Sequence, residues 1–295
     1  MHPESFYKYC SAEVAKIILS TQKIRWSSPA LFNDPYDCYF SLAPKFDINS
    51  VKKNLKEQFV NLLTQDEEPC LVSDNPFSEK IKLLRGLLYG KTRAEVDEFI
   101  SHDFNSSLDD FDDRVKMTDC LWKKEYDDLR ILCVCEHHDN LLLWAHYADN
   151  HKGAVFQLDC IKDLDSPLLA AERVRYTNEI PSLATEDEWI ATTLGLLPYP
   201  EGLDVWRRLV LSKAKGWEYE NEWRVVTTRR PYEKSGFEDT SILPQEISSV
   251  FLGCKTGRNE RNNILALLQG PFEHVKAFQA TQDKKRFRLE FERIK

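Results

Sequence analysis

The amino-acid sequence predicts an α+β protein with a mixed β-sheet. Runs rich in β-branched and aromatic residues, typical of strands, occur near both ends of the chain. Segments with helical periodicity lie between them, and residues from about 48 to 130 are charged and mainly helical in pattern. With 295 residues, 42% of them hydrophobic, the chain can bury a sizeable core. We expect one α+β domain over residues 1–295, with a helical insertion at about 48–130.

The chain begins with an alternation of strand and helix. Phe6–Tyr9 is predicted as a strand, Ser11 as the cap of a helix that ends at Leu19, and Ile24–Ser28 as a second strand. The apolar face of the helix is expected to consist of Val14, Ile17 and Ile18. An acidic, proline-bounded turn follows at residues 31–37, and such a loop can carry function or form an ordinary Asx turn.

The insertion is predicted to contain three helices. These are Ile48–Leu63, Phe77–Tyr89, and a third that opens at the capping box Thr92–Glu95 and ends near Ile100. The acidic interval 103–113 is expected to be a loop. No functional motif occurs in this part of the chain.

Strands and helices alternate again after residue 130. The predicted strands are Ile131–Cys135, Ala154–Asp159, Glu172–Tyr176, Ile247–Leu252, Val275–Gln279 and Arg286–Glu292, the last two forming a hairpin. The predicted helices are Leu141–Tyr147 with Asn140 as its cap, Glu186–Leu196, Leu203–Lys213 and Asn259–Leu268.

The stretch Lys215–Thr228 contains the densest group of chemically useful side chains. Its ending, Trp223–Thr228, is predicted as a strand, and the same alternation at the entry to that strand would place Glu218, Glu220 and Glu222 on one face. Three like charges on one face repel one another, so a purely structural strand gains nothing from them. The structural alternative is a solvated edge whose charges Lys215 and Arg224 balance.

Composition narrows the possible partners and location. The net charge of −8 argues against a broad phosphate-binding surface, although a local basic groove stays open. Two basic spots occur, Arg224 with Arg229–Arg230, and Lys284–Arg286 with Arg288; we expect both to be solvated. The eight scattered cysteines indicate reduced thiols, and neither an export signal nor a run of about 20 apolar residues occurs, so we expect a cytoplasmic protein without a membrane partner.

Familiar catalytic motifs are missing, and one cluster of histidines is a candidate metal site. Gly-x-Ser-x-Gly, Gly-x-Gly-x-x-Gly and the phosphate-loop motif do not occur. His137, His138, His146 and His151 lie close together in sequence, but their spacing lacks the i,i+4 pairing of helical zinc sites. We therefore expect turn and cap roles and no metal, and keep a metal-dependent hydrolase or nuclease as an alternative.

Four ordered motifs resemble the bacterial domain-of-unknown-function family 2971. They are Tyr7–Ser11; Trp26–Pro29 with Phe32–Asp37; Leu143–Asp149 with His151–Gly153; and Lys215 with Trp217–Arg224. Together they span nearly the whole chain. The resemblance implies membership of a family whose biochemical role is not settled.

A more distant resemblance implies a mechanism. Asn221–Val226 is similar to the Asn-Glu-aromatic-x-Val strand of the ADP-ribosyltransferase superfamily, in which the glutamate binds the nicotinamide-ribose hydroxyl of NAD. The strand-helix-strand order near the N-terminus and again at 131–159 also resembles that fold, with its mixed, split sheet. Where the superfamily has an arginine or histidine on its first strand, this chain has Lys8 or Tyr9.

The resemblance implies that Glu222 stabilises the positive charge that develops when NAD loses nicotinamide, with Glu220 as an orienting group or base. The residues expected to bind NAD are Lys8, Tyr9, Ser11, Asn33, Asp34, His146 and Tyr147. By analogy the protein would transfer ADP-ribose to a protein or nucleic-acid target, as a toxin or phage-defence effector. The alternative is a non-catalytic protein that binds a nucleotide or partner on the same scaffold.

Overall fold

The structure is a computed structural model of the whole chain, and it describes residues 2–38, 47–107, 126–182, 184–198 and 202–295. Helices and a mixed, largely antiparallel sheet confirm the predicted α+β class. The chain forms two compact units. Unit 1 comprises Met1–Cys38, Glu125–Glu179 and Leu211–Lys295; unit 2 comprises Tyr39–Lys124 and Ile180–Val210. Among the described helices, none has the length and apolar character needed to cross a membrane.

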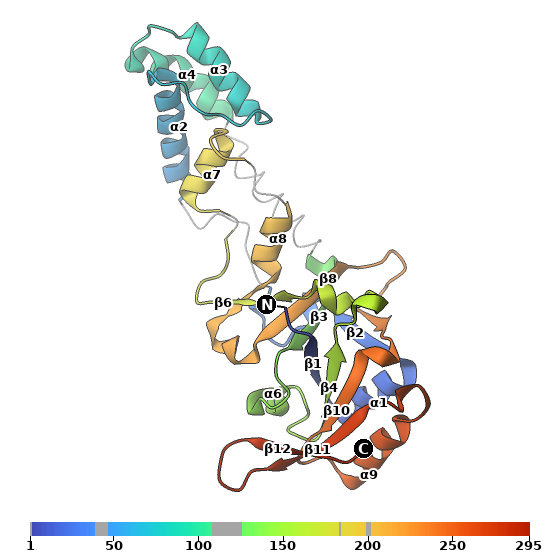
Figure 1. Cartoon of the computed structure of the whole chain (residues 1–295). Helices are drawn as coiled ribbons and strands as arrows, with labels where there is room; N and C mark the ends of the chain where they lie inside the picture. The colour runs from blue at the N-terminus through green and yellow to red at the C-terminus, as the bar shows by residue number, and fades with distance from the viewer. Residues whose placement is uncertain (1, 39–46, 108–125, 183, 199–201) are drawn as a thin grey trace. The chain divides into compact units, whose positions relative to one another are not determined.

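Unit 1 is built on one large sheet (Figure 1). The path along it runs β12-β11-β10-β4-β1-β3-β2-β9, and β8 joins β3 and β5. Within this sheet β10 and β11 pair in parallel, and the other pairs are antiparallel. Its strands are β1 (Ser5–Cys10), β2 (Lys23–Ser27), β3 (Leu129–Cys135), β4 (Ala154–Asp159), β5 (Glu172–Arg173), β8 (Glu222–Thr228), β9 (Phe237–Ser241), β10 (Ile247–Leu252), β11 (Lys276–Gln282) and β12 (Leu289–Arg293).

The sheet opens beside β3. β8 pairs with β3 along its whole length, from Leu129 to Cys135. On the opposite edge β1 pairs only at Cys135 and β2 only at Ile131. These two positions lie about 13 Å apart along a strand. β1 and β2 therefore meet β3 at different ends, and a fork lies between them.

Helices cover both faces of the sheet. Successive side chains of a strand point to opposite faces, and neighbouring residues of β4 are buried on both. Phe156 packs on the side of α1 (Ala12–Thr21) and α9 (Arg258–Leu267), whereas Val155 packs on the side of α6 (Leu141–His146). Figure 1 shows α1 and α9 together and α6 apart from them. The loop after α6 lies close to the ends of β1 and β10. A Cβ at Gly153, in this loop, would lie 2.1 Å from Cys10 O, and a Cβ at Gly253, directly after β10, would lie 2.0 Å from His151 O, so both positions require glycine.

The predicted apolar face of α1 is wrong in part. Val14 and Ile17 are 41% and 46% exposed, and Ile18 is buried. The buried residues are Ala15, Ile18 and Leu19. Both sets repeat at three- and four-residue intervals, so periodicity alone cannot choose which apolar stripe faces the sheet.

Unit 2 is helical. Its helices are α2 (Ile48–Thr64), α3 (Pro76–Leu87), α4 (Arg93–Ser107), α7 (Glu186–Thr193) and α8 (Gly202–Val210). α2, α3, α4 and α7 share one apolar core that includes Phe59, Ile81 and Ile190. α4 continues beyond Ile100, so the predicted loop begins too early; residues 108–113 of that loop lie outside the described residues.

Two further predictions near residues 172 and 213 are wrong. The strand expected at Glu172–Tyr176 is two strands, because Val174 N donates to Glu222 O and Arg175 N then donates to Leu211 O. The chain thus leaves β8 and pairs, as β6 (Arg175–Thr177), with β7 (Ser212–Ala214) in parallel. The helix expected to reach Lys213 ends at Val210, which places Lys213 on β7.

Candidate functional site

The segment before β8 does not have the extended, alternating conformation that the sequence predicts for the entry to this strand. Lys215–Glu220 forms a 3-10 helix, and Asn221 then adopts a left-handed conformation with φ of 44°, which asparagine tolerates well. Glu218 is exposed on this helix and pairs with Lys215 at 2.7 Å. Only Glu220 and Glu222 are buried, so the three glutamates do not share one face.

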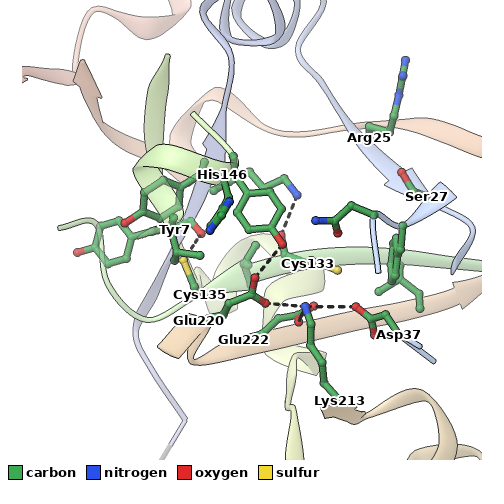
Figure 2. A pocket seen from close by; sticks show the side chains of 18 of the residues that line it. Tyr7, Arg25, Ser27, Asp37, Cys133, Cys135, His146, Lys213, Glu220 and Glu222 are labelled. Carbon is green, nitrogen blue, oxygen red and sulfur yellow. Dashed lines mark hydrogen bonds and ion pairs between the residues drawn. The ribbon is translucent and has the colours of Figure 1, made fainter. Parts of the chain in front are cut away.

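Lys213 holds these two glutamates together inside unit 1. Its Nζ lies 2.5 Å from Glu220 Oε2, 2.8 Å from Glu222 Oε2 and 3.2 Å from Asp37 Oδ2. All four side chains are at most 6% exposed. Figure 2 shows them gathered on one side of a cavity.

Arg224, which follows Glu222 on the same face of β8, completes the cluster. Its Nε donates to Glu222 Oε1 at 2.8 Å, and its Nη2 donates to Glu222 Oε2 at 3.0 Å and to Asp37 Oδ1 at 2.6 Å. The planar guanidinium suits this two-pronged contact with a carboxylate. Both oxygens of Glu222 are therefore occupied by cations.

The cluster of Asp37, Lys213, Glu220, Glu222 and Arg224 contains three carboxyl groups and two cations. Burial opposes ionisation of Glu222, but Arg224 and Lys213 outweigh it and hold the pKa of Glu222 well below its ordinary value. At Glu220 burial dominates over the attraction of Lys213 and raises the pKa of that carboxyl. The two glutamates thus differ in proton affinity, and Glu220 takes a proton more readily.

Two tyrosines fix the glutamates further. Tyr147 Oη donates to Glu220 Oε1 at 2.7 Å, and Tyr176 Oη accepts from Glu222 N at 2.8 Å. Burial, followed by the nearby Glu220 charge, raises the pKa of Tyr147, so its hydroxyl stays a donor. Tyr147 also interacts with Asn33. Glu220 consequently has one hydrogen bond on each carboxylate oxygen.

A cavity of about 360 Å³ lies in the fork between β1 and β2, next to the charged cluster. Lys8 on β1, Ser27 on β2 and Cys133 on β3 contribute to its walls. Both predicted catalytic glutamates line it, as do the predicted binding residues Lys8, Tyr9, Asn33, His146 and Tyr147. Seven of the nine predicted site residues therefore line one cavity.

Two of the predicted binding residues do not line this cavity. Ser11 caps α1 by accepting a hydrogen bond from Val14 N at 3.2 Å. The carboxylate of Asp34 accepts from Tyr36 N at 2.9 Å, which is the ordinary Asx-turn role. Both side chains bond to their own local backbone, as Ser and Asp commonly do.

The side chains of Lys8 and Tyr9 have structural partners. Lys8 Nζ donates to the carbonyl of Cys133 at 2.8 Å, on the stretch of β3 that neither β1 nor β2 covers. Tyr9 Oη donates to the carbonyl of His137 at 2.9 Å and is buried. Lys8 thus places a cation at the fork itself.

Aromatic rings gather next to the cluster. The ring centres of Trp217 and Tyr219 lie 6.0 Å apart, and His146 lies 6.3 Å and 6.5 Å from them. The Lys213 ammonium lies 5.2 Å from the Trp217 ring, within the range of a cation–π contact. This aromatic cluster contacts the charged cluster through Lys213 and adds apolar surface beside it.

The histidine cluster does not form a metal site among the described residues. His138 stacks on Phe251 with ring centres 4.3 Å apart, and His151 lies parallel to Trp144 at 6.3 Å. His146 belongs to the aromatic cluster described above. Within the described ranges, no three His, Cys, Asp or Glu side chains come together as metal ligands.

Sequence reasoning did not identify Lys213 or Asp37 as site residues. Asp37 belongs to the acidic turn at residues 31–37, but no pattern in the sequence indicates that it contacts Arg224, 187 positions later. Lys213 was expected on a helix, where nothing would link it to Glu220 seven residues later. The excess of carboxylates around position 220 was the available signal that a buried cation must lie nearby.

Comparisons with known proteins give one match. No curated protein and no solved structure matches the chain. The model of DUF2971, described as a protein of unknown function, matches residues 143–225. That segment contains Tyr147, Lys213, Glu220, Glu222 and Arg224. The match confirms the predicted resemblance to the DUF2971 family over the segment that supplies most of the charged cluster.

Proposed function

We propose that this protein is an ADP-ribosyltransferase-like enzyme that binds NAD in the cavity of unit 1 and breaks the bond between ribose and nicotinamide. The observation that carries the proposal is the environment of Glu220. This carboxyl lines the cavity, has a raised pKa, and belongs to a buried cluster in which carboxyl groups outnumber cations.

The reaction has electrostatic needs that this arrangement meets. The ribose carbon becomes positively charged as the bond to nicotinamide breaks, and the bonding electron pair leaves with neutral nicotinamide. A fixed carboxylate beside that carbon stabilises the developing charge. The attacking hydroxyl or amine of the acceptor then bonds to the ribose carbon and gives its proton to a base. A carboxyl whose pKa lies above the ordinary value is a better proton acceptor.

The two glutamates have different roles in this proposal. The resemblance gives the charge-stabilising role to Glu222, but Arg224 and Lys213 occupy both of its oxygens, so in this proposal Glu222 supplies a fixed negative charge and positions Lys213. Glu220, with one hydrogen bond on each oxygen, stabilises the ribose cation and accepts the proton. Asn33, Lys8 and Tyr147 offer polar groups on the cavity wall for the ribose and phosphate oxygens.

A non-catalytic nucleotide-binding protein is the second candidate, because saturation of both Glu222 oxygens by cations also suits a purely structural carboxylate. Titration calorimetry with NAD tests binding, with wild-type protein and Asn33→Ala. We expect wild-type binding and at least a tenfold loss in Asn33→Ala. Binding without nicotinamide release would favour the second candidate; absence of binding would refute both.

The acceptor and the biological role are part of the same proposal. ADP-ribose would be transferred to a protein or nucleic acid, which fits a toxin or phage-defence effector by analogy with small bacterial members of the superfamily. NAD labelled in the adenylate part, incubated with cell extract, tests transfer. Label in a macromolecule with wild-type protein, and none with Glu220→Gln, is the expected result.

A further inference from the structure

The loop between β11 and β12 presents an unusual set of side chains. Lys284, Lys285 and Arg286 are exposed, and Phe287 has its whole side chain in solvent, with a relative exposure of 102%. A fully exposed phenyl ring costs solvation free energy and contributes no packing to the fold. Figure 1 shows the loop extending away from the body of the sheet.

The loop is ordered by its own hydrogen bonds. The carboxylate of Asp283 accepts from Lys285 N at 2.7 Å, from Arg286 N at 3.2 Å and from Arg288 Nε at 2.6 Å. Asp283 N in turn donates to Arg288 O at 3.2 Å. Asp283 therefore closes the loop, and its carboxylate orders the backbone of the tip at Lys285 and Arg286.

The tip carries uncompensated positive charge. Arg288 is neutralised by Asp283 at 2.6 Å and by Glu290 at 3.2 Å. By contrast, no ion pair to Lys284, Lys285 or Arg286 occurs within the parts of the chain that the structure describes. Three exposed cations and one exposed aromatic ring are thus consecutive in one loop of a protein whose net charge is −8.

We infer that this tip, Lys284–Phe287, is a binding site for single-stranded nucleic acid. The three cations would contact successive phosphates, and a base would stack on the ring of Phe287, which is the combination that binds single strands without sequence preference. The ligand class is a single-stranded polynucleotide, DNA or RNA. This inference does not depend on the proposed NAD chemistry, because the tip contributes nothing to that cavity.

Charge favours a strand over an anionic membrane. A membrane surface would face a broad area of the protein, whose remaining charge is strongly negative and would be repelled. A single strand can contact the tip alone, because a flexible chain needs no flat approach. A duplex holds its bases inside the stack, so it would not use Phe287.

Fluorescence anisotropy with a labelled 20-nucleotide single strand, as DNA and as RNA, tests the inference. We expect binding at 50 mM salt that weakens about eighteenfold at 200 mM, as three phosphate contacts on a single strand imply. The variant K284A/K285A/R286A should lose at least tenfold in affinity. F287A should lose about fivefold or more, and F287Y should retain binding, since stacking needs the ring.

The matched control is K23A/K162A/K255A, which removes three exposed lysines elsewhere in unit 1. It should bind like wild type. Absence of single-strand binding at 50 mM salt would overturn the inference, as would equal losses in the two triple variants. Tighter binding to phosphatidylserine vesicles than to the single strand would overturn it in favour of a membrane. Circular dichroism checks that each variant is folded.

Discussion

The ammonium of Lys213 lies 2.5 Å from Oε2 of Glu220, and both side chains are buried. The same nitrogen lies 2.8 Å from Glu222 Oε2. One lysine therefore keeps two glutamates side by side where little water is present to screen them. Without that cation the two carboxylates would repel each other strongly in a poorly solvated environment.

Replacing Lys213 by methionine should destabilise unit 1 severely. The change leaves Asp37, Glu220 and Glu222 with Arg224 as their one remaining cation in the cluster. Removal of one partner from a buried ion pair typically costs about 3–5 kcal/mol. Urea unfolding at neutral pH measures the loss.

Lys215→Met is the matched control. Lys215 pairs with Glu218, and both side chains are half exposed. Such surface pairs contribute about 0–1 kcal/mol, so the control should unfold close to wild type. Similar losses of unfolding free energy in the two variants would show that the buried Lys213 contacts stabilise unit 1 no more than an exposed ion pair does.

Glu222→Gln and Glu220→Gln should differ in stability. The pKa of Glu222 is lowered on folding, so its contribution is present above the ordinary glutamate value and disappears as pH falls towards the lowered one. The pKa of Glu220 is raised, so the folded protein holds more protons and stability falls as pH rises through the window above the ordinary value.

At pH 7 the Glu222→Gln variant should therefore lose about 3–5 kcal/mol, because its amide would face two buried cations. Glu220→Gln should unfold at the wild-type urea concentration or above it. A larger loss for Glu220→Gln than for Glu222→Gln would contradict the roles assigned to the two carboxyl groups.

Tyr147→Phe should raise the pKa of Glu220 further. The Tyr147 hydroxyl stabilises the ionised carboxylate by donating to it at 2.7 Å, and the change removes that bond. A reaction that needs ionised Glu220 then reaches its full rate only at a higher pH, so the acidic limb of the pH–rate profile shifts to higher pH. Tyr7→Phe is the control, because Tyr7 lines the same cavity without bonding to Glu220.

Gly153→Ala should destabilise the sheet. A Cβ at this position would lie 2.1 Å from the carbonyl oxygen of Cys10 on β1, so backbone must shift. Overpacking of this kind costs about 1–3 kcal/mol. Gly216→Ala, whose Cβ would meet nothing within 4 Å, should leave the thermal midpoint unchanged or slightly higher. An unchanged midpoint for Gly153→Ala would contradict the close approach.

Local patterns predicted most of the elements but not how they pair. The apolar, partly β-branched and aromatic run at the start of Ala154–Asp159 and the Asn140 cap before α6 were sufficient because local chemistry decides them. The fork beside β3 could not be predicted, because it depends on where β1 and β2 meet that strand, and pairing register is a long-range property.

The site was predicted in part for the same reason. Glu220 and Glu222 attracted attention through their spacing, but their separate protonation behaviour depends on Lys213 and Arg224 in three dimensions. The turn at Asn221 also broke the assumed strand, which removed Glu218 from the group. Asp37 reaches the cluster from a distant loop, and no local pattern encodes that contact.

The central claim is tested most directly by measuring nicotinamide release from NAD, with wild-type protein and with Glu220→Gln. Chromatography measures the release, and calorimetry measures NAD binding by the same two proteins. We predict release by wild type, and a rate at least about a hundredfold lower in Glu220→Gln with NAD affinity retained, because positioned acid–base groups contribute about 10²–10⁴-fold. Equal rates in the two proteins, or wild-type protein that binds NAD and releases no nicotinamide, would contradict it.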